Sequence, residues 1–200
     1  MKENLLTKTA ELAMYVTLSY IREGDFAVDA TCGNGHDTLA LARAVGTAGT
    51  VLAVDLQEAA VASCGKLLRE HRIDNTIQVC GNFLHLDRYI GEKAEGRNPR
   101  AVVFNLGYLP GGDKEITTRS RDTVQAAAKA ADLVEPGGIV TLVMYPGHRE
   151  GSLERKALLE WAETLDAGRY HTVYASLPNQ KKNPPEILWI TRKDTRREKP

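Results

Sequence analysis

Apolar residues along the chain occur in two patterns, as short continuous runs and as longer stretches with three- and four-residue spacing. The first pattern predicts buried strands and the second predicts amphipathic helices. Strands are expected at 26–29, 50–55, 76–80, 101–105, 139–145, 170–175 and 187–191. Helices are expected at 7–22, 37–45, 57–71, 118–134 and 152–165, with a short helix or turn at 84–90 and polar loop at 92–100.

This alternation of strands and helices predicts a Rossmann-like α/β fold, with a mostly parallel seven-stranded sheet and helices on both faces. The last two strands follow each other closely, which predicts an antiparallel hairpin at the sheet edge. The 200 residues, 42% hydrophobic and 26% charged, suit one domain spanning 1–200. Within it, 1–24 holds an N-terminal helix, and 181–200 is a basic segment that includes the last strand.

The loop after the first strand is the first candidate binding site. In open α/β sheets, ligands bind beyond the carboxyl ends of the strands. Gly33 and Gly35 in this loop allow positive φ and a close approach of ligand to backbone. Asp55 ends the second strand, where a carboxylate can accept both hydroxyls of a ribose. Together they predict an adenosine-type cofactor; the alternative is a plain turn, with Asp55 as a helix cap.

Two residues distinguish between possible cofactors. A dinucleotide motif has a third glycine where this chain has Thr38. Asp29, just before the glycine loop, would repel a pyrophosphate but can attract the α-ammonium group of S-adenosylmethionine (SAM), directly or through water. The residues therefore favour SAM over NAD.

The loop after the fourth strand is the candidate acceptor site, because the sheet places it beside the first loop. Methyl transfer is an in-line displacement, so the acceptor lone pair must be aligned behind the methyl group. Asn105 and a neighbouring backbone carbonyl can accept N–H bonds from an amine, and Tyr108 can pack against a planar base. The alternative is that Gly107 and Pro110 only form the loop and Asn105 caps a turn.

Four segments resemble the bacterial YtqB-like rRNA methylase family, in the same order and over nearly the whole chain: Asp29–Thr38, Asp55–Gln57, Asn105–Lys114 and Tyr145–His148. The resemblance implies a class I methyltransferase fold and SAM as cofactor. It also implies methylation of the aminomethyl nitrogen of the tRNA wobble uridine, giving 5-methylaminomethyluridine. The tRNA anticodon region would then be the partner.

The expected site residues form three groups. The cofactor group contains Asp29, Thr31, Gly33, Asn34, Gly35, Asp37, Thr38, Asp55, Gln57, Asn82, Phe83 and Asn105. The catalytic group contains Asn105, Tyr108 and His148, and the RNA group contains Leu109, Pro110, Lys114, Arg119, Tyr145, His148 and Arg149. Gly81-Asn82-Phe83 departs from the Ser-His-Glu-like stretch of the family. Asn82 can still bond the adenine edge, and Phe83 can pack on its ring.

The acceptor must be a neutral amine, although an alkylamine is largely protonated in neutral water. The site must therefore lower the amine pKa or remove a proton. His148, after the fifth strand, is a candidate base, but it can equally contact phosphate or have no role. Arg149 can meet a phosphate, and Lys114, Arg119 and Arg121 are further candidates or merely solvated charges.

Cysteine positions and charge narrow the function further. Cys32, Cys64 and Cys80 have no CxxC spacing, and none lies in the loops after the fourth or fifth strand. Carbon methylation of uridine through a cysteine adduct is therefore disfavoured, and no metal site is expected. A net charge of zero argues against holding long duplex nucleic acid by charge alone. The basic segment 181–200 is either a local RNA-binding patch or a solvated terminus.

Location, assembly and rival functions complete the expectations. Reduced thiols, with no apolar leader and no membrane-spanning run, predict a cytoplasmic protein. An apolar face on the N-terminal helix either serves a homodimer or packs on the sheet. The rival functions are methylation of rRNA or of a small amine, a non-catalytic SAM- or nucleotide-binding module, and an NAD-dependent oxidoreductase.

Overall fold

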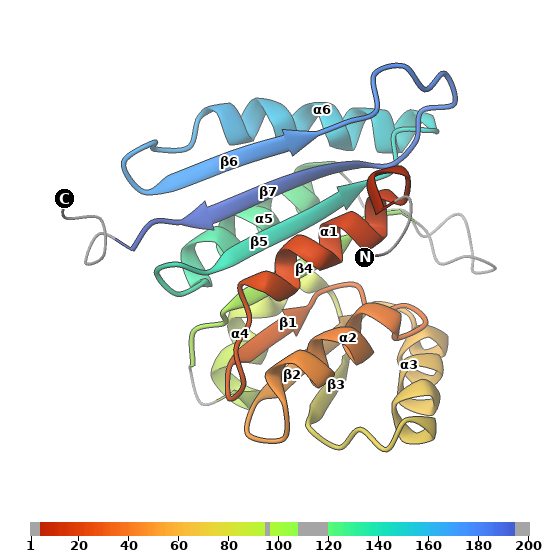
Figure 1. The fold of residues 1–200 in the computed structure, drawn as a ribbon, viewed down its shortest axis with the longest axis vertical. Coiled ribbons are helices and arrows are strands. Elements are labelled where there is room, and N and C mark those ends of the chain that lie inside the picture. Colours follow the sequence, from red (N-terminus) through yellow and green to blue (C-terminus); the bar gives the residue numbers. More distant parts are fainter. Residues whose placement is uncertain (1–4, 95–96, 108–119, 195–200) are drawn as a thin grey trace.

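A seven-stranded sheet in the order β3-β2-β1-β4-β5-β7-β6 runs through the molecule (Figure 1). The computed structural model describes residues 5–94, 97–107 and 120–194. Strands β1 to β5 are parallel, and β7 is antiparallel to both β5 and β6. The predicted Rossmann-like sheet with a terminal hairpin is thus confirmed. The strands are β1 Phe26–Asp29, β2 Thr50–Asp55, β3 Thr76–Cys80, β4 Ala101–Asn105, β5 Ile139–Met144, β6 Tyr170–Ala175 and β7 Glu186–Arg192.

Helices cover both faces of the sheet, as predicted. One face carries the 3-10 turn η1 (Leu5–Thr7), α1 (Thr9–Ser19), α2 (His36–Val45) and α3 (Glu58–Glu70). The other carries the 3-10 turn η2 (Phe83–His85), α4 (Leu86–Lys93), α5 (Ser120–Leu133) and α6 (Arg149–Glu163). Because both faces are buried, the central strands are continuous apolar runs rather than alternating ones.

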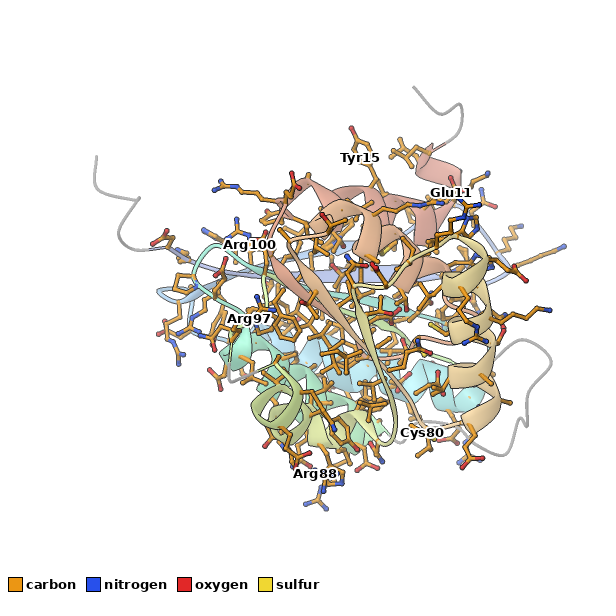
Figure 2. The ribbon with its side chains drawn as sticks, turned by 90° about the horizontal axis from the view of Figure 1, so that it is seen from below. Glu11, Tyr15, Cys80, Arg88, Arg97 and Arg100 are labelled. Atoms are coloured by element: carbon orange, nitrogen blue, oxygen red, sulfur yellow. The ribbon has the colours of Figure 1, made fainter. Side chains whose placement is uncertain are left out.

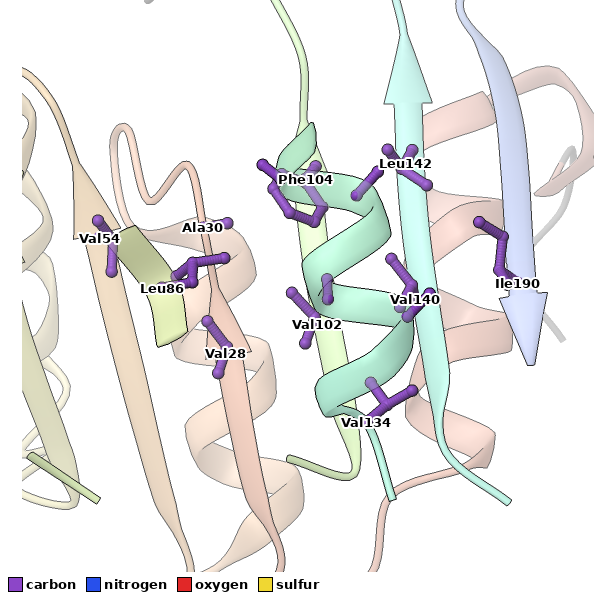
Figure 3. Packing of buried hydrophobic residues seen from close by; sticks show 14 of the residues in the cluster. Val28, Ala30, Val54, Leu86, Val102, Phe104, Val134, Val140, Leu142 and Ile190 are labelled. Atoms are coloured by element: carbon purple, nitrogen blue, oxygen red, sulfur yellow. The ribbon is translucent and has the colours of Figure 1, made fainter. Parts of the chain in front are cut away.

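The larger core lies between the sheet and helices α4, α5 and α6 (Figure 3). Val28, Val102 and Val140 project from neighbouring strands, and Leu86 and Val134 meet them from the other layer. The inner face of α5 is built of alanines, which let the helix approach the sheet closely. These alanines are Ala126, Ala127, Ala130 and Ala131, each at most 1% exposed.

Three helix boundaries differ from the sequence expectation by three residues. Helix α1 ends at Ser19 instead of residue 22, and α4 continues to Lys93 through what was expected to be polar loop. Helix α6 begins at Arg149 instead of residue 152, because the His148 side chain caps it: Nδ1 accepts a hydrogen bond from the Gly151 N–H at 3.1 Å. A histidine is a weak sequence signal for a helix start compared with Ser, Thr, Asp or Asn.

The apolar face of helix α1 packs on the sheet, which is one of the two roles considered for it, and the homodimer stays a prediction. Ala13 and Met14 are buried against the sheet, and the Thr17 hydroxyl meets that of Thr141 in β5 at 2.7 Å. Tyr15 is 66% exposed and projects away from the body of the protein (Figure 2). Leu6 in η1 is 70% exposed.

The strand directions determine where loops gather. Strands β1, β2, β4 and β5 end at one edge of the sheet, here called the carboxyl edge, so the loops that follow them lie side by side there. Strand β7 runs the other way, so the chain enters it at the carboxyl edge and leaves it at the opposite edge. Every site loop predicted from sequence follows a parallel strand.

Candidate active site

Asp29 is a buried carboxyl group at the centre of the carboxyl edge. It is 1% exposed; Oδ2 accepts a bond from the Thr38 hydroxyl at 2.6 Å, and Oδ1 accepts one from the Thr31 N–H at 3.2 Å. Burial, followed by the negative charge of Asp37, raises its pKa to about 8, and the hydrogen bonds from Thr38 and Thr31 oppose this rise. Thr38 thus replaces the third glycine of a dinucleotide motif with a hydroxyl that Asp29 uses.

The glycine loop has the positive φ angles that its two glycines predicted. Gly33 and Gly35 have φ values of 49° and 87°. A Cβ on Gly35 would lie 2.9 Å from Cα of Cys64, so α3 closes the space behind the loop. Cys32 and Cys64 are both buried there, and their mutual hydrogen bond raises the pKa of the Cys32 thiol, as does burial. Cys32 therefore packs in the same buried cluster as Cys64.

Asp55 ties the glycine loop to the loop after β2. Its Oδ2 accepts from the Gly33 N–H at 2.9 Å, and its Oδ1 accepts from the Gln57 N–H at 3.0 Å. An ionised carboxylate offers about four lone-pair positions, so two remain for the hydroxyls of a ribose. Asp55 can therefore shape the loop and bind a ligand at once.

Asn105 is the last residue of the adjacent strand β4, and two polar contacts hold it there. Its backbone N–H donates to the Thr31 hydroxyl at 2.7 Å, and its side-chain Nδ2 donates to Oδ2 of Asp37 at 3.2 Å. Burial raises the pKa of Asp37, and the hydrogen bond from Asn105 opposes that rise. Because the amide nitrogen faces the carboxyl group, the carbonyl oxygen of Asn105 faces away from it.

Tyr145 closes the same cluster from the loop after β5. Burial, and then the charge of Asp37, raises the pKa of its hydroxyl, while a hydrogen bond with Asn105 opposes this. A Cβ on Gly107 would lie 3.5 Å from the tyrosine ring. The structure thus brings Asp37, Asn105 and Tyr145 together, as sequence order alone could not.

Other predicted residues serve structural contacts at the same edge. Asn82 accepts from the Leu84 N–H at 2.9 Å, and the Phe83 ring packs edge-on against Phe104 with centroids 5.9 Å apart. Asn34 accepts from the Ser63 hydroxyl at 3.2 Å. Their cofactor contacts stay predictions. The predicted Tyr108, Leu109, Pro110, Lys114 and Arg119 lie outside the described residues.

Leu56 is a candidate that the sequence analysis missed. It lies between Asp55 and Gln57 and is 55% exposed, an unusual position for a large apolar side chain. Beside the Asp55 carboxylate it offers an apolar surface on which a planar base can pack. The available signal was a leucine placed just beyond the last buried residue of a strand.

A hollow of about 540 Å³ lies at the opposite edge of the sheet, lined in part by Tyr20, Arg100 and Glu135. Arg100 and Cys80 lie toward opposite sides of the molecule (Figure 2). The hollow is therefore separate from the carboxyl-edge site. Within the described ranges, no cluster of three or more His, Cys, Asp or Glu could hold a metal ion. No described helix is long and apolar enough to cross a membrane.

Comparison with known proteins gives consistent matches. A family model described as "Putative rRNA methylase" matches residues 51–191. The chloroplastic tRNA (mnm(5)s(2)U34)-methyltransferase of Arabidopsis thaliana is 39% identical over 168 residues, which are 80% of this chain. The chain spans 60% of the length of that plant relative.

Two solved structures share nearly the whole fold. A "putative rRNA-methylase" from Clostridium thermocellum has a TM-score of 0.87 and 35% identity, covering 96% of this chain and 99% of its own. A "putative methyltransferase" from Streptococcus mutans in complex with SAH has a TM-score of 0.81 and 27% identity, covering 92% and 97%. The fold is that of the class I SAM-dependent methyltransferases, and the chain belongs to the rRNA methylase family.

Proposed function

We propose that this protein is a SAM-dependent N-methyltransferase that converts 5-aminomethyluridine to 5-methylaminomethyluridine at the wobble position of tRNA. The observation that carries the nitrogen acceptor is the fixed amide of Asn105, whose carbonyl oxygen faces away from Asp37. Such an oxygen can accept an N–H bond from an amine and orient its lone pair. The plant relative, named as a tRNA (mnm(5)s(2)U34)-methyltransferase, supports tRNA as the carrier of that amine.

The residues at the carboxyl edge fit SAM, which supplies an electrophilic methyl group when bound. Asp55 keeps lone pairs for two ribose hydroxyls, and Leu56 offers an apolar surface for adenine. Asp29 faces the α-ammonium group in this assignment, directly or through water. An adjacent cation favours the ionised carboxylate, so binding would lower the raised pKa of Asp29.

Proton removal needs no dedicated base in this proposal. His148 accepts the Gly151 N–H at Nδ1, so its neutral ring carries the proton at Nε2, and that atom is buried. We therefore assign His148 to capping α6, in place of the general base considered from sequence. The neighbouring sulfonium charge disfavours an ammonium acceptor and so lowers the pKa of the amine.

Further proposals concern location, assembly and extent. We place the reaction in the cytoplasm and at the tRNA anticodon, carried out by one domain spanning 1–200. A homodimer remains a prediction, and exposed Tyr15 and Leu6 are the residues to test. Sedimentation of the wild type and of Tyr15→Ser separates a dimer from a monomer.

The test is methyl transfer from labelled SAM to purified RNA, followed by mass spectrometry of the nucleosides. The RNA comes from a strain that lacks this protein. We expect 5-methylaminomethyluridine to form in tRNA at the expense of 5-aminomethyluridine. Label that enters only rRNA, the acceptor class in the family description, would overturn the tRNA assignment.

Two variants examine the acceptor role. Asn105→Ala should slow transfer strongly while calorimetry finds SAM affinity within a few fold of the wild type. Gln125→Ala removes an exposed amide on α5 and should change neither property. Equal losses of SAM affinity and transfer in Asn105→Ala would contradict an acceptor role for this amide.

A further inference from the structure

The loop at residues 176–185, which joins β6 to β7 and is here called the β6–β7 loop, lies at the carboxyl edge. Strand β7 is antiparallel to β5, and Glu186 pairs with Met144, the last residue of β5. Figure 1 shows the loop on the side to which the arrowhead of β5 points. A part of the basic C-terminal segment therefore stands beside the candidate active site.

The β6–β7 loop approaches the segment after β5 closely. A Cβ on Gly147 would lie 3.8 Å from the backbone oxygen of Asn183. Lys181 and Lys182 directly precede Asn183, while His148 and Arg149 directly follow Gly147. Two basic segments that are separate in sequence thus meet at the rim of the site.

Local interactions hold the β6–β7 loop in a defined shape. The Gln180 N–H donates to the Leu177 oxygen at 3.0 Å, and Asn183 has a φ of 46° in the left-handed region. At the base of the loop, Nε of Arg155 pairs with Oε2 of Glu186 at 2.6 Å. The loop also contains three prolines, Pro178, Pro184 and Pro185. A preorganised loop loses less entropy when its side chains bind a partner.

The charges on this rim are predominantly positive. Lys181, Lys182 and Arg149 are exposed, and none forms an ion pair within the described part of the chain. Glu150 is the exposed acid next to Arg149, whereas Glu186 is engaged by Arg155. The rim therefore keeps an excess of positive charge at the edge where the acceptor must enter.

We propose that Lys181, Lys182 and Arg149 form a phosphate-binding rim that holds the backbone of the RNA acceptor beside Asn105. This inference rests on the proposed function for the choice of RNA as ligand. Lysine and arginine contacts to phosphate supply affinity and register without reading sequence. The rim would thus compensate for the zero net charge of the whole chain.

The test compares two variants that change the net charge equally. Lys181→Ala/Lys182→Ala removes two charges from the rim, and Lys93→Glu changes the charge by the same amount at the C-terminus of α4, toward the opposite edge. The tRNA is purified from a strain that lacks this protein, and its binding is measured at salt concentrations between about 50 and roughly 200 mM. SAM affinity is measured by calorimetry, and initial rates give kcat and KM for tRNA.

Loss of two phosphate contacts should make the slope of log K against log salt shallower by about 1.4, where K is the association constant for tRNA. The same loss should lower the affinity for tRNA on the order of 25-fold at about 0.1 M salt. KM for tRNA should rise while kcat and SAM affinity stay at wild-type values. Lys93→Glu should leave the salt slope unchanged. A rise in KM without a change in the salt slope would overturn the phosphate assignment.

Two outcomes separate this inference from the proposed function. If the wild type methylates tRNA and the double alanine variant binds tRNA as tightly as Lys93→Glu, the rim is refuted and the function stands. If the wild type transfers no methyl group to tRNA, yet the double variant loses affinity and salt slope as expected, the rim stands and the function fails.

Discussion

The buried carboxyl group of Asp29 should make the stability of the ligand-free protein fall as pH rises. Its folded-state pKa is raised from 3.8 to about 8, chiefly by burial. Between these two values the folded protein retains a proton that the unfolded chain has released. Unfolding therefore releases a proton, and rising pH favours the unfolded state. The perturbation that isolates this effect is Asp29→Asn.

The variant preserves the contacts around the group. The asparagine oxygen can accept from the Thr31 N–H, and its amide nitrogen can donate to the Thr38 hydroxyl, which now acts as acceptor. One pKa unit corresponds to about 1.4 kcal/mol, so the free-energy cost of keeping Asp29 protonated at pH 7 is on the order of 4 kcal/mol. Between pH 5 and pH 7 the stability advantage of Asp29→Asn should grow by roughly 3 kcal/mol.

Urea unfolding followed by circular dichroism at pH 5, 6 and 7 measures this advantage. Asp87→Asn serves as the control, because Asp87 is an exposed acid whose shift has the opposite sign. Burial is the largest single influence and raises its pKa, but hydrogen bonds with Lys129 and the Arg88 backbone and the charge of Lys129 together lower the pKa below its ordinary value. Its contribution is lost only as pH falls through that lowered pKa, so its effect should be constant from pH 5 to 7. An Asp29→Asn advantage that fails to widen over this range, or a less stable variant at pH 7, would refute the reasoning.

Two further predictions concern Asp29 and the glycine loop that follows it. SAM binding at pH 7 should release up to one proton, because the α-ammonium group of SAM would favour the ionised form of Asp29. Calorimetry in buffers of different ionisation enthalpy measures this release. Undiminished release in Asp29→Asn would exclude Asp29 as the source of the proton. Gly35→Ala should lose about 1–3 kcal/mol of stability and most SAM affinity, since its φ is 87° and the new Cβ would meet Cα of Cys64 at 2.9 Å. Gly91 lies inside α4, and a Cβ added there would have no atom within 4 Å. Gly91→Ala should therefore gain about 0.5–1 kcal/mol of stability. Thermal and urea unfolding measure both glycine variants.

The sequence predicted the order of the elements because each central strand is a short apolar run bounded by turn residues. The cofactor loop was equally readable, since Gly33, Gly35 and Asp55 stand at strand ends where such a site must lie. Thr38 in the sequence argued against a dinucleotide motif. Only the folded structure shows that its hydroxyl donates to Asp29.

The sequence did not predict the contacts between segments at the carboxyl edge. Asp55 binds Gly33, which lies 22 positions earlier, and no periodicity reports that pairing. The cluster of Asp37, Asn105 and Tyr145 likewise joins the start of α2, the end of β4 and the loop after β5, which meet only because β1, β4 and β5 are adjacent. The capping contact of His148, whose Nδ1 accepts from the Gly151 N–H, was likewise not predicted from the sequence.

The basic C-terminal segment shows why a count of charges along a chain is not a map of a surface. Residues 181–200 contain seven basic and three acidic residues, which reads as one patch. Strand β7 divides the described part of this segment: Lys181 and Lys182 precede the strand at the carboxyl edge, whereas Arg192 is its last residue and donates to backbone oxygens of Asp132 and Val134 near the end of α5. Seven residues of extended chain separate the two groups by about 20 Å, more than the Debye length of about 10 Å at 0.1 M salt. The two groups therefore act independently, and among the basic residues described up to residue 194, Lys181 and Lys182 are those that stand where an RNA acceptor would enter the site.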